Sequence, residues 1–429
     1  MALRRQSAAV AMLAAPLSGL LVLGSAGAAV AAPDQVSGVV VSGLLYEHQA
    51  KIGVPTAPVT FSSDGRGDLP VKYEYWINGG KHKTIKADKT GSAIVYLTFT
   101  THLNGMYVEG IGADGTAGLA TFNYYFADGA TPAAEKDSDG DGVPDIVTVG
   151  DPSGLGSGLW LAAGRPAGYA TGRVRTPAVN ITGKTAGGDP SYFDGAKIIT
   201  GNFLDDNLQD VMIYFVDGPK AGAGMILPGS GDGSPLTDID GIDAGLDYFS
   251  DWDGNSPIDL ANAYKSSGFT NATPDFIGIS GNPSNGYHLA YYPIQINFPL
   301  PTSSEMTPNL TPTGGTDWEN WQLFSTQVRS GTAIYLWNRT TGALYLWEGV
   351  RFTDNGDGTG SITYQQYEIA QSWNTGATYS TVEAVDFTGD GTPDLWTVTP
   401  AGVATAYVVS NLSLTAPAKI SAKAPQNLG

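Results

Sequence analysis

A strand signal that returns about every sixty residues is the feature that most constrains this chain. Its five copies begin at Asp145, Asp210, Asp275, Ala333 and Asp394, which are 65, 65, 58 and 61 residues apart. Each copy is rich in β-branched, aromatic and other apolar residues, and a Gly-containing turn and a second strand signal follow it. One such unit cannot bury both of its faces alone, so the units must stack. The period predicts a β-propeller of about five blades, whose closure could use strands from both ends of the region.

An acidic loop precedes the first copy, with carboxylates at positions 1, 3, 5 and 9 of nine residues (137–145). Like charges crowded into so short a loop repel one another unless a cation neutralises them. Oxygen ligands at this spacing suit Ca²⁺, with a backbone carbonyl expected at position 7. The predicted ligands are Asp137, Asp139, Asp141, Val143 and Asp145.

The loop before the last copy (386–394) repeats this pattern, with a neutral threonine oxygen at position 3. Neither loop is an EF-hand, because Thr148 and Thr397 occupy position 12, where an EF-hand needs a bidentate Glu, and because β-rich segments follow. Acidic Asx-turns without metal are the alternative interpretation. The ligands predicted here are Asp386, Thr388, Asp390, Thr392 and Asp394.

Two other loops are weaker metal candidates. The loop before Asp210 has Leu204 at position 3, which cannot ligate, and the loop 251–259 breaks the period because it ends only sixteen residues before Asp275. We interpret the second of these as an insertion. The weaker candidate ligands are Asn202, Asp206 and Asp210 in one loop and Asp251, Asp253, Asn255 and Asp259 in the other.

The repeated Gly-Asp-Gly-x-Pro-Asp motif resembles the FG-GAP or VCBS repeats of secreted bacterial proteins, which are related to the integrin α-subunit propeller. The match is close at residues 389–395, good at 140–146 and degenerate at 201–211. The resemblance covers about residues 131–420. It implies a propeller whose loop acids bind Ca²⁺ structurally and whose function is ligand binding or adhesion. The middle repeats depart from the pattern, so fewer loops than repeats are expected to hold metal.

The N-terminus has the features of a secretory signal peptide, residues 1–32. Arg4 and Arg5 precede an apolar run from Ala8 to about Leu23, and small residues lead to a cleavage site after Ala31 or Ala32. Both the general and the twin-arginine export routes remain open. We therefore expect a secreted, extracellular protein without a permanent membrane span.

Residues 33–130 lack acidic loops of this type and alternate apolar with polar residues between turn signals such as Asn104-Gly105. This pattern predicts an immunoglobulin-like β-sandwich, without the Cys–Trp–Cys pattern of antibody domains. Residues 127–136 are expected to form an exposed linker to the propeller, residues 131–429.

The charge balance excludes one class of partner. The net charge is 22 − 41 = −19 for the whole chain and 20 − 41 = −21 without the signal peptide, which contains two Arg and no acid. Nucleic-acid binding is not expected, because the basic surface that it needs is missing. The chain has no Cys, so bound Ca²⁺ could supply reinforcement that disulfides cannot.

Signals for catalysis are poor. The sequence has no Cys nucleophile, no Gly-x-Ser-x-Gly elbow and no His-Glu-x-x-His motif. We expect a monomeric, Ca²⁺-binding module that binds an extracellular protein or glycan without turnover. The alternatives are a propeller glycosidase and a carbohydrate-targeting scaffold. Five tryptophans could stack on sugars or pack between blades, namely Trp160, Trp337, Trp347, Trp373 and Trp396.

Overall fold

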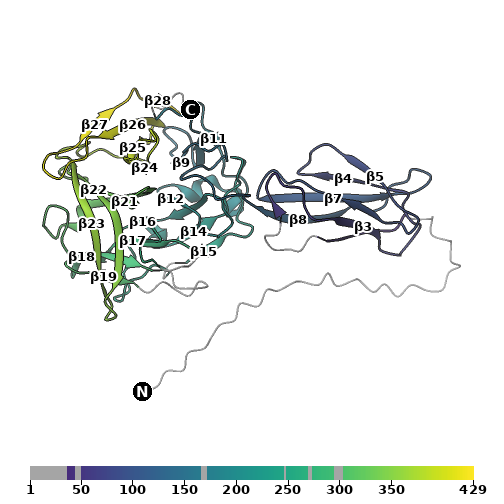
Figure 1. The fold of residues 1–429 in the computed structure, drawn as a ribbon, viewed down its shortest axis with the longest axis horizontal. Coiled ribbons are helices and arrows are strands. Elements are labelled where there is room, and N and C mark those ends of the chain that lie inside the picture. Colours follow the sequence, from purple (N-terminus) through teal and green to yellow (C-terminus); the bar gives the residue numbers. More distant parts are fainter. Residues whose placement is uncertain (1–35, 44–49, 166–171, 246–247, 269–272, 294–302) are drawn as a thin grey trace, which may run out of the picture.

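The chain folds into β-strands arranged as two bodies (Figure 1). The computed structural model describes residues 36–43, 50–165, 172–245, 248–268, 273–293 and 303–429, so the expected signal peptide lies outside the described residues. Strands account for 45% of the structure and helices for 4%, which confirms the all-β class. None of the helices in the described part has the length and apolar character needed to cross a membrane.

The first body consists of two sheets that face each other. One sheet has the order β1-β3-β6 and the other β2-β8-β7-β4-β5. Alternate residues of each strand point into a shared core, where Phe61, Tyr73 and Met106 are fully buried. The strands are β1 (Val39–Ser42), β2 (Ala50–Lys51), β3 (Val59–Ser63), β4 (Lys72–Ile77), β5 (Lys83–Lys86), β6 (Ala93–Val95), β7 (Leu103–Ile111) and β8 (Thr121–Asp128).

The second body contains the repeated strands and four sheets. Strands β9, β13 and β25 are buried along their whole length, because both faces of their sheets are covered. Its strands are β9 (Ile146–Gly150), β10 (Gly158–Ala162), β11 (Val179–Asn180), β12 (Lys197–Gly201), β13 (Asp210–Tyr214), β14 (Gly224–Leu227), β15 (Ile242–Ala244), β16 (Asp259–Tyr264), β17 (Asp275–Asn282), β18 (Gly286–Tyr292), β19 (Ser304–Met306), β20 (Trp321–Val328), β21 (Gly331–Asn338), β22 (Leu344–Asp354), β23 (Thr359–Ala370), β24 (Thr381–Val385), β25 (Asp394–Val398), β26 (Val403–Ser410), β27 (Lys419–Ala422) and β28 (Gln426–Asn427). Short 3₁₀ helices are η2 (Thr185–Gly188), η3 (Pro190–Phe193), η4 (Gly218–Lys220) and η5 (Trp318–Asn320).

Five strands of this body contact one another in a closed cycle, in the order β9, β12, β16, β20, β24 and back to β9. From each of them the strands that follow in the sequence extend outward, and β16 and β20 are the two ends of one sheet. Five apolar clusters lie between successive groups of strands, and the last of them joins β25 and β26 to β9 and β10. The repeated units therefore bury their faces against their neighbours around the cycle.

The third and fourth repeats share one sheet. Its eight strands follow the order β16-β17-β18-β19-β23-β22-β21-β20, and β19 pairs with β23 in parallel through Glu305↔Thr359 and Met306↔Gly360. Because β16 also contacts β20, this sheet is nearly closed and barrel-like. The sequence repeat predicts five separate blades, and the outer pairing of β19 with β23 is the departure from that expectation.

The junction between the bodies matches the expected exposed linker only in its middle, where residues 130–132 and 134 are exposed, whereas both of its ends are buried. Strand β8 continues to Asp128, and Lys136 is 6% exposed. The amide of Gly129 donates to the Asp206 carbonyl (2.8 Å), and Lys136 Nζ lies 3.5 Å from Glu383 Oε1. The Lys136 side chain lies at the centre of the strand cycle, so the second body holds this segment at its two ends.

The C-terminal segment packs between the last and first repeats. Strand β28 pairs with β26, and the Ala178 amide donates to the Leu428 carbonyl (2.6 Å). Leu428 is fully buried in the cluster that contains Trp396 and Ile146. Residues from both ends of the repeat region therefore meet at this seam.

Candidate metal sites and ligand pocket

Three carboxylates of the first acidic loop converge. Asp137, Asp139 and Asp145 each offer a carboxylate oxygen, and these atoms lie within 4.8 Å of one another. Two oxygens bound to one Ca²⁺ at ~2.3–2.6 Å can be at most about 5 Å apart. The donor set is all oxygen and the spacing suits that ion, so the residues fit a bound Ca²⁺.

Backbone hydrogen bonds hold this loop in shape. The Asp137 carboxylate accepts the amides of Gly140 (2.8 Å) and Gly142 (2.9 Å). Gly142 has a φ of 83°, and a Cβ on it would meet no atom within 4 Å. The glycine at position 6 is therefore required by its left-handed backbone rather than by close packing.

The closing residue of the loop, Asp145, is 1% exposed. Its carboxylate accepts the Ser138 amide (2.8 Å) and the Gly164 amide (2.7 Å), which ties the loop to the segment that follows β10. Burial raises the pKa of Asp145 to about 7, and burial also raises the pKa values of Asp137 and Asp139. A cation among these groups would favour their charged forms.

Asp141, at position 5, is not part of the convergent group. Its Oδ2 accepts from Arg175 Nη2 at 2.6 Å, while Arg175 Nη1 lies 3.5 Å from Asp139 Oδ2. Val143 takes part through its amide, which donates to Asp141 Oδ1 (3.0 Å). The Arg175 guanidinium thus supplies positive charge at the rim of the loop.

The last loop has the same internal bonds. Asp386 accepts the amides of Gly389 (2.7 Å) and Gly391 (2.8 Å), and Asp394 accepts the amides of Thr388 (3.2 Å) and Val409 (2.9 Å). Burial raises the pKa of Asp394 to about 7.

Positions 3, 5 and 7 of this last loop complete the pattern. Thr388 Oγ1 donates to Asp386 Oδ1 (3.3 Å), and the Thr392 amide donates to Asp390 (2.8 Å). With threonine at position 3, the loop does not form a group of three convergent acids. Its backbone geometry is nevertheless that of the first loop.

The degenerate loop before β13 keeps its closing residue and lies beside a histidine of the first body. Asp210 accepts the amides of Phe203 (2.7 Å) and Gly229 (2.9 Å), and burial followed by the charge of Asp206 raises its pKa. Asp206 Oδ2 lies 3.7 Å from Nδ1 of the buried His102, which comes from the first body. The Asn202 Oδ1 atom is buried without a hydrogen-bond partner in the described structure.

In the inserted loop, Asp251 and Asp259 have separate partners. Asp251 accepts the Asn255 and Asp253 amides (2.8 and 3.0 Å) and the Ser280 hydroxyl (2.7 Å). Asp259 opens β16, accepts from Lys197 Nζ at 2.7 Å and also accepts the Leu323 amide. Among the described residues, three acids converge in the first loop and not here.

Charged side chains meet at the centre of the strand cycle, a feature that the sequence interpretation missed. Lys136, Lys197 and Glu383 line a space of only about 20 Å³, which opens toward a pocket of about 120 Å³ beside Asp259. Burial raises the pKa of Glu383 to about 7, against the opposing effect of Lys136. A charged residue within an otherwise apolar strand, as Glu383 is within Thr381–Val385, was the available signal.

The tryptophans of the repeats pack inside the protein. Trp337, Trp347, Trp373 and Trp396 are 1–6% exposed, and Tyr364 stacks on Trp347 with ring centroids 3.9 Å apart. These four are too buried to form the open stacking platform that the sequence allowed, and the fifth, Trp160, is half-buried.

Exposed aromatic rings occur instead on the outer face of the first body. Trp76 stacks between His82 (4.1 Å) and Tyr107 (5.2 Å), and Tyr107 contacts Phe122 (4.5 Å). Both faces of Trp76 are therefore covered by neighbouring rings.

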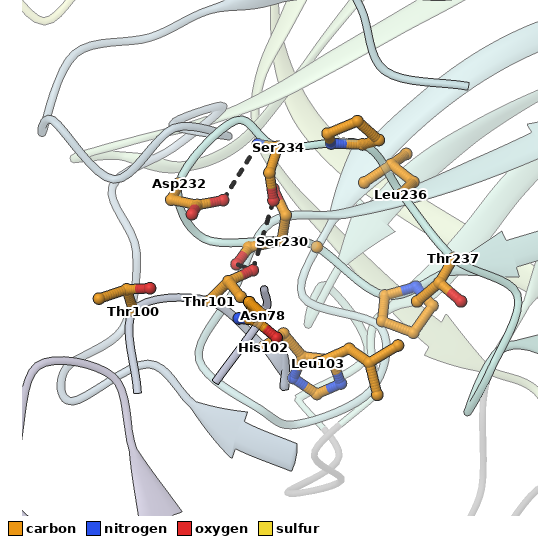
Figure 2. Close-up of a pocket in the computed structure, with 13 residues that line it drawn as sticks. Asn78, Thr100, Thr101, His102, Leu103, Ser230, Asp232, Ser234, Leu236 and Thr237 are labelled. Atoms are coloured by element: carbon orange, nitrogen blue, oxygen red, sulfur yellow. Dashed lines mark hydrogen bonds between the residues drawn. The ribbon is translucent and has the colours of Figure 1, made fainter. Parts of the chain in front are cut away.

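A pocket of about 350 Å³ lies between the two bodies (Figure 2). One wall comes from the segment 100–103 between β6 and β7, and the other from the loop 228–237 after β14. The His102 amide and the Thr101 hydroxyl both donate to the Ser230 carbonyl (2.9 Å each), which joins the walls.

No protein-family model and no curated protein matches this chain. Among solved structures, the exotype rhamnogalacturonan lyase YesX is 12% identical with a TM-score of 0.24, covering 86% of this chain and 73% of that chain. A Ca²⁺-stabilized adhesin of an Antarctic bacterium that binds ice is 11% identical with a TM-score of 0.18, covering 91% and 98%. Similarities this low carry no argument about function.

Proposed function

We propose that the mature protein is a secreted, Ca²⁺-stabilised binding or adhesion module. In this proposal residues 1–32 are a signal peptide, residues 33–130 an immunoglobulin-like unit and residues 131–429 a five-bladed propeller of the FG-GAP type. The ligand is an extracellular protein or glycan. The observation that carries the proposal is the convergence of Asp137, Asp139 and Asp145 within 4.8 Å in a loop that fits Ca²⁺.

Calcium has a structural role in this proposal. An ion that binds only the native state stabilises it in proportion to RT ln(1 + [L]/Kd). Extracellular sites of this kind have dissociation constants of about 10⁻⁴–10⁻³ M. Millimolar Ca²⁺ therefore acts as a stabiliser and not as a reactant.

The test is a melting curve of the mature chain in millimolar Ca²⁺ and in excess chelator. Ca²⁺ should raise the melting temperature, and Asp139→Asn should reduce that rise, whereas Asp64→Asn, an exposed change in the first body, should not. Identical melting curves with and without chelator would refute the calcium role.

A glycosidase is the alternative, and the centre of the strand cycle brings carboxyl groups of different repeats near one another. Glycosidases place two carboxyl groups about 5–9.5 Å apart in an open cleft. Glu383 and Asp259 lie at this centre, but the space at Glu383 is about 20 Å³, while ligand pockets are ~300–1,000 Å³. This size disfavours a glycosidase site at Glu383. Hydrolysis of a polysaccharide panel that Glu383→Gln abolishes would support the enzyme instead.

A further inference from the structure

The pocket between the two bodies has the dimensions and the construction of a ligand site. Its volume of about 350 Å³ lies within the ~300–1,000 Å³ typical of such sites, which often occur at domain interfaces. Hydrogen bonds from Thr101 and His102 to the Ser230 carbonyl fix one wall against the other. Thr101 and Ser234 hydroxyls also lie 3.4 Å apart. The pocket is therefore formed before any ligand enters.

Polar groups are concentrated on one side of the lining. Figure 2 shows Asp232, Ser234 and Thr101 on that side, and Leu103, Leu236 and Thr237 on the other. Hydroxyl groups can donate and accept at the same time. Asp232 Oδ1 accepts the Ser234 amide (3.0 Å), and its second oxygen can accept from a ligand.

The charge of the pocket selects against anions. The lining contains Asp232 and neither Lys nor Arg, in a chain with a net charge of −19. A carboxylate or phosphate ligand would be repelled by Asp232, with no lysine or arginine in the lining to offset that repulsion. The complementary ligand is neutral, with hydroxyl groups on one edge and apolar C–H groups on the other.

We propose that this pocket binds a neutral saccharide unit, with its hydroxyls toward Asp232, Ser234 and Thr101 and its apolar face toward Leu103 and Leu236. The proposal rests on the binding role given above and supplies it with a site and a ligand class. A sugar in this position contacts both bodies, so it also holds them together.

The experiment uses the intact mature chain in saturating Ca²⁺. Glucose, galactose, mannose, rhamnose, N-acetylglucosamine and their neutral disaccharides are titrated by saturation-transfer NMR and calorimetry, with galacturonic acid as the charged comparator. At least one neutral sugar should bind, and galacturonic acid should bind more weakly than galactose. Hydrogen exchange should show protection of both walls, residues 100–103 and 228–237.

Variants locate the site. Asp232→Ala should weaken binding roughly tenfold, the equivalent of a lost hydrogen bond to a charged group, and Thr237→Trp should block the pocket. Asp238→Asn, an exposed change in the same loop outside the lining, should bind as the wild type does. Melting temperatures of all variants report whether each has folded.

Three results would overturn the proposal. They are no binding of any neutral sugar, binding that survives Thr237→Trp, and binding that is lost on Tyr364→Ala, which alters an aromatic pocket beside Trp347 instead. If Ca²⁺ stabilises the chain while no sugar binds, only the pocket assignment fails. If sugar binds to a chain that Ca²⁺ does not stabilise, the calcium role fails.

Discussion

Arg175 stands beside the most crowded acids of the chain and competes with the ion that they would bind. Its guanidinium contacts Asp141 at 2.6 Å and Asp139 at 3.5 Å, and its side chain is 51% exposed. A bound ion and the Arg175 guanidinium would neutralise the same carboxylates. Each therefore reduces the electrostatic stabilisation that the other provides. The sequence pattern could not show this, since Arg175 lies thirty residues after the loop.

Arg175→Gln should tighten Ca²⁺ binding and destabilise the chain in chelator. An exposed ion pair contributes about 0.2–1 kcal/mol, so the dissociation constant should fall roughly 1.4- to 5-fold. Calorimetric titration with Ca²⁺ measures the change, and Arg173→Gln, an exposed arginine two residues away, is the matched control. Weaker Ca²⁺ binding in the Arg175 variant would mean that the guanidinium helps to hold the loop in its metal-bound form.

Glu383 should make the chain less stable as pH rises. Burial raises its pKa to about 7 from 4.5, so the folded state holds the proton more tightly than the unfolded state does. The stability that the folded state has from holding this proton is fully present below about pH 4.5 and is lost as pH rises through 7. Glu383→Gln keeps the neutral shape, and its stability relative to wild type should increase between pH 5 and 8 by up to about 3 kcal/mol.

Urea midpoints of both proteins at the two pH values, with Ca²⁺ held constant, measure this difference. Other titrating groups are common to both proteins and cancel in the comparison. Parallel pH profiles would show that Lys136 keeps Glu383 charged throughout.

At the scale of the element, each acidic loop is joined to its sheet through its closing aspartate. Asp145 and Asp210 both accept an amide nineteen residues later, from Gly164 and Gly229, and Asp394 accepts the amide of Val409. The degenerate loop 202–210 keeps this bond although it has Leu204 at position 3, where a ligand would stand. The closing residue therefore has a fold-forming role that does not depend on metal.

Asp394→Ala and Asp275→Ala separate the two roles. Asp275 accepts from the Ser267 hydroxyl (2.5 Å) and the Tyr291 hydroxyl (2.8 Å), in a loop without a ligand set. In chelator both variants should lose about 1–3 kcal/mol, because buried donors lose their acceptor. In millimolar Ca²⁺ the Asp394 variant should show the larger loss relative to wild type. Denaturant midpoints in both buffers decide the matter, and equal losses in Ca²⁺ would remove Asp394 from the predicted ligands.

The repeated elements could be predicted from the sequence because a buried strand with both faces covered is a short, continuous apolar run. The strands that begin near Asp210, Asp275 and Asp394 lie where that signal occurs. The closed cycle of strands and the pairing of β19 with β23 could not be predicted, because they depend on contacts between distant segments. The convergence of Asp139 with Asp145 follows from loop spacing, whereas the partners of Asp259 depend on tertiary packing.

On the scale of the whole molecule, the two bodies share a buried junction. His102 approaches Asp206 at 3.7 Å, and Gly129 and Ala133 donate backbone hydrogen bonds to the loop 202–210. These contacts flank a short stretch, residues 130–132, that is exposed. Separating the bodies would expose His102 and Asp206 to water and leave loop carbonyls without partners.

A fragment of residues 33–130 should fold without Ca²⁺, since it contains no acidic loop of the repeat type. A fragment of residues 131–429 should keep its Ca²⁺ response but melt several degrees below the same region of the intact chain, because the contacts from His102 and Gly129 are lost. Circular dichroism and calorimetry of the fragments and the mature chain test both statements. An unfolded first fragment, or equal melting temperatures for the second, would contradict them.

The seam at which the C-terminal segment packs determines how the molecule responds to mechanical load. A pulling force applied at the two ends enters the second body near Lys136 and leaves it near Leu428, so it acts across the first and last repeats. These are held to each other by side-chain contacts and a few backbone bonds, whereas the third and fourth repeats share one continuous sheet. Under tension we therefore expect the short strand β28 to detach from β26 first, before the eight-stranded sheet bears load.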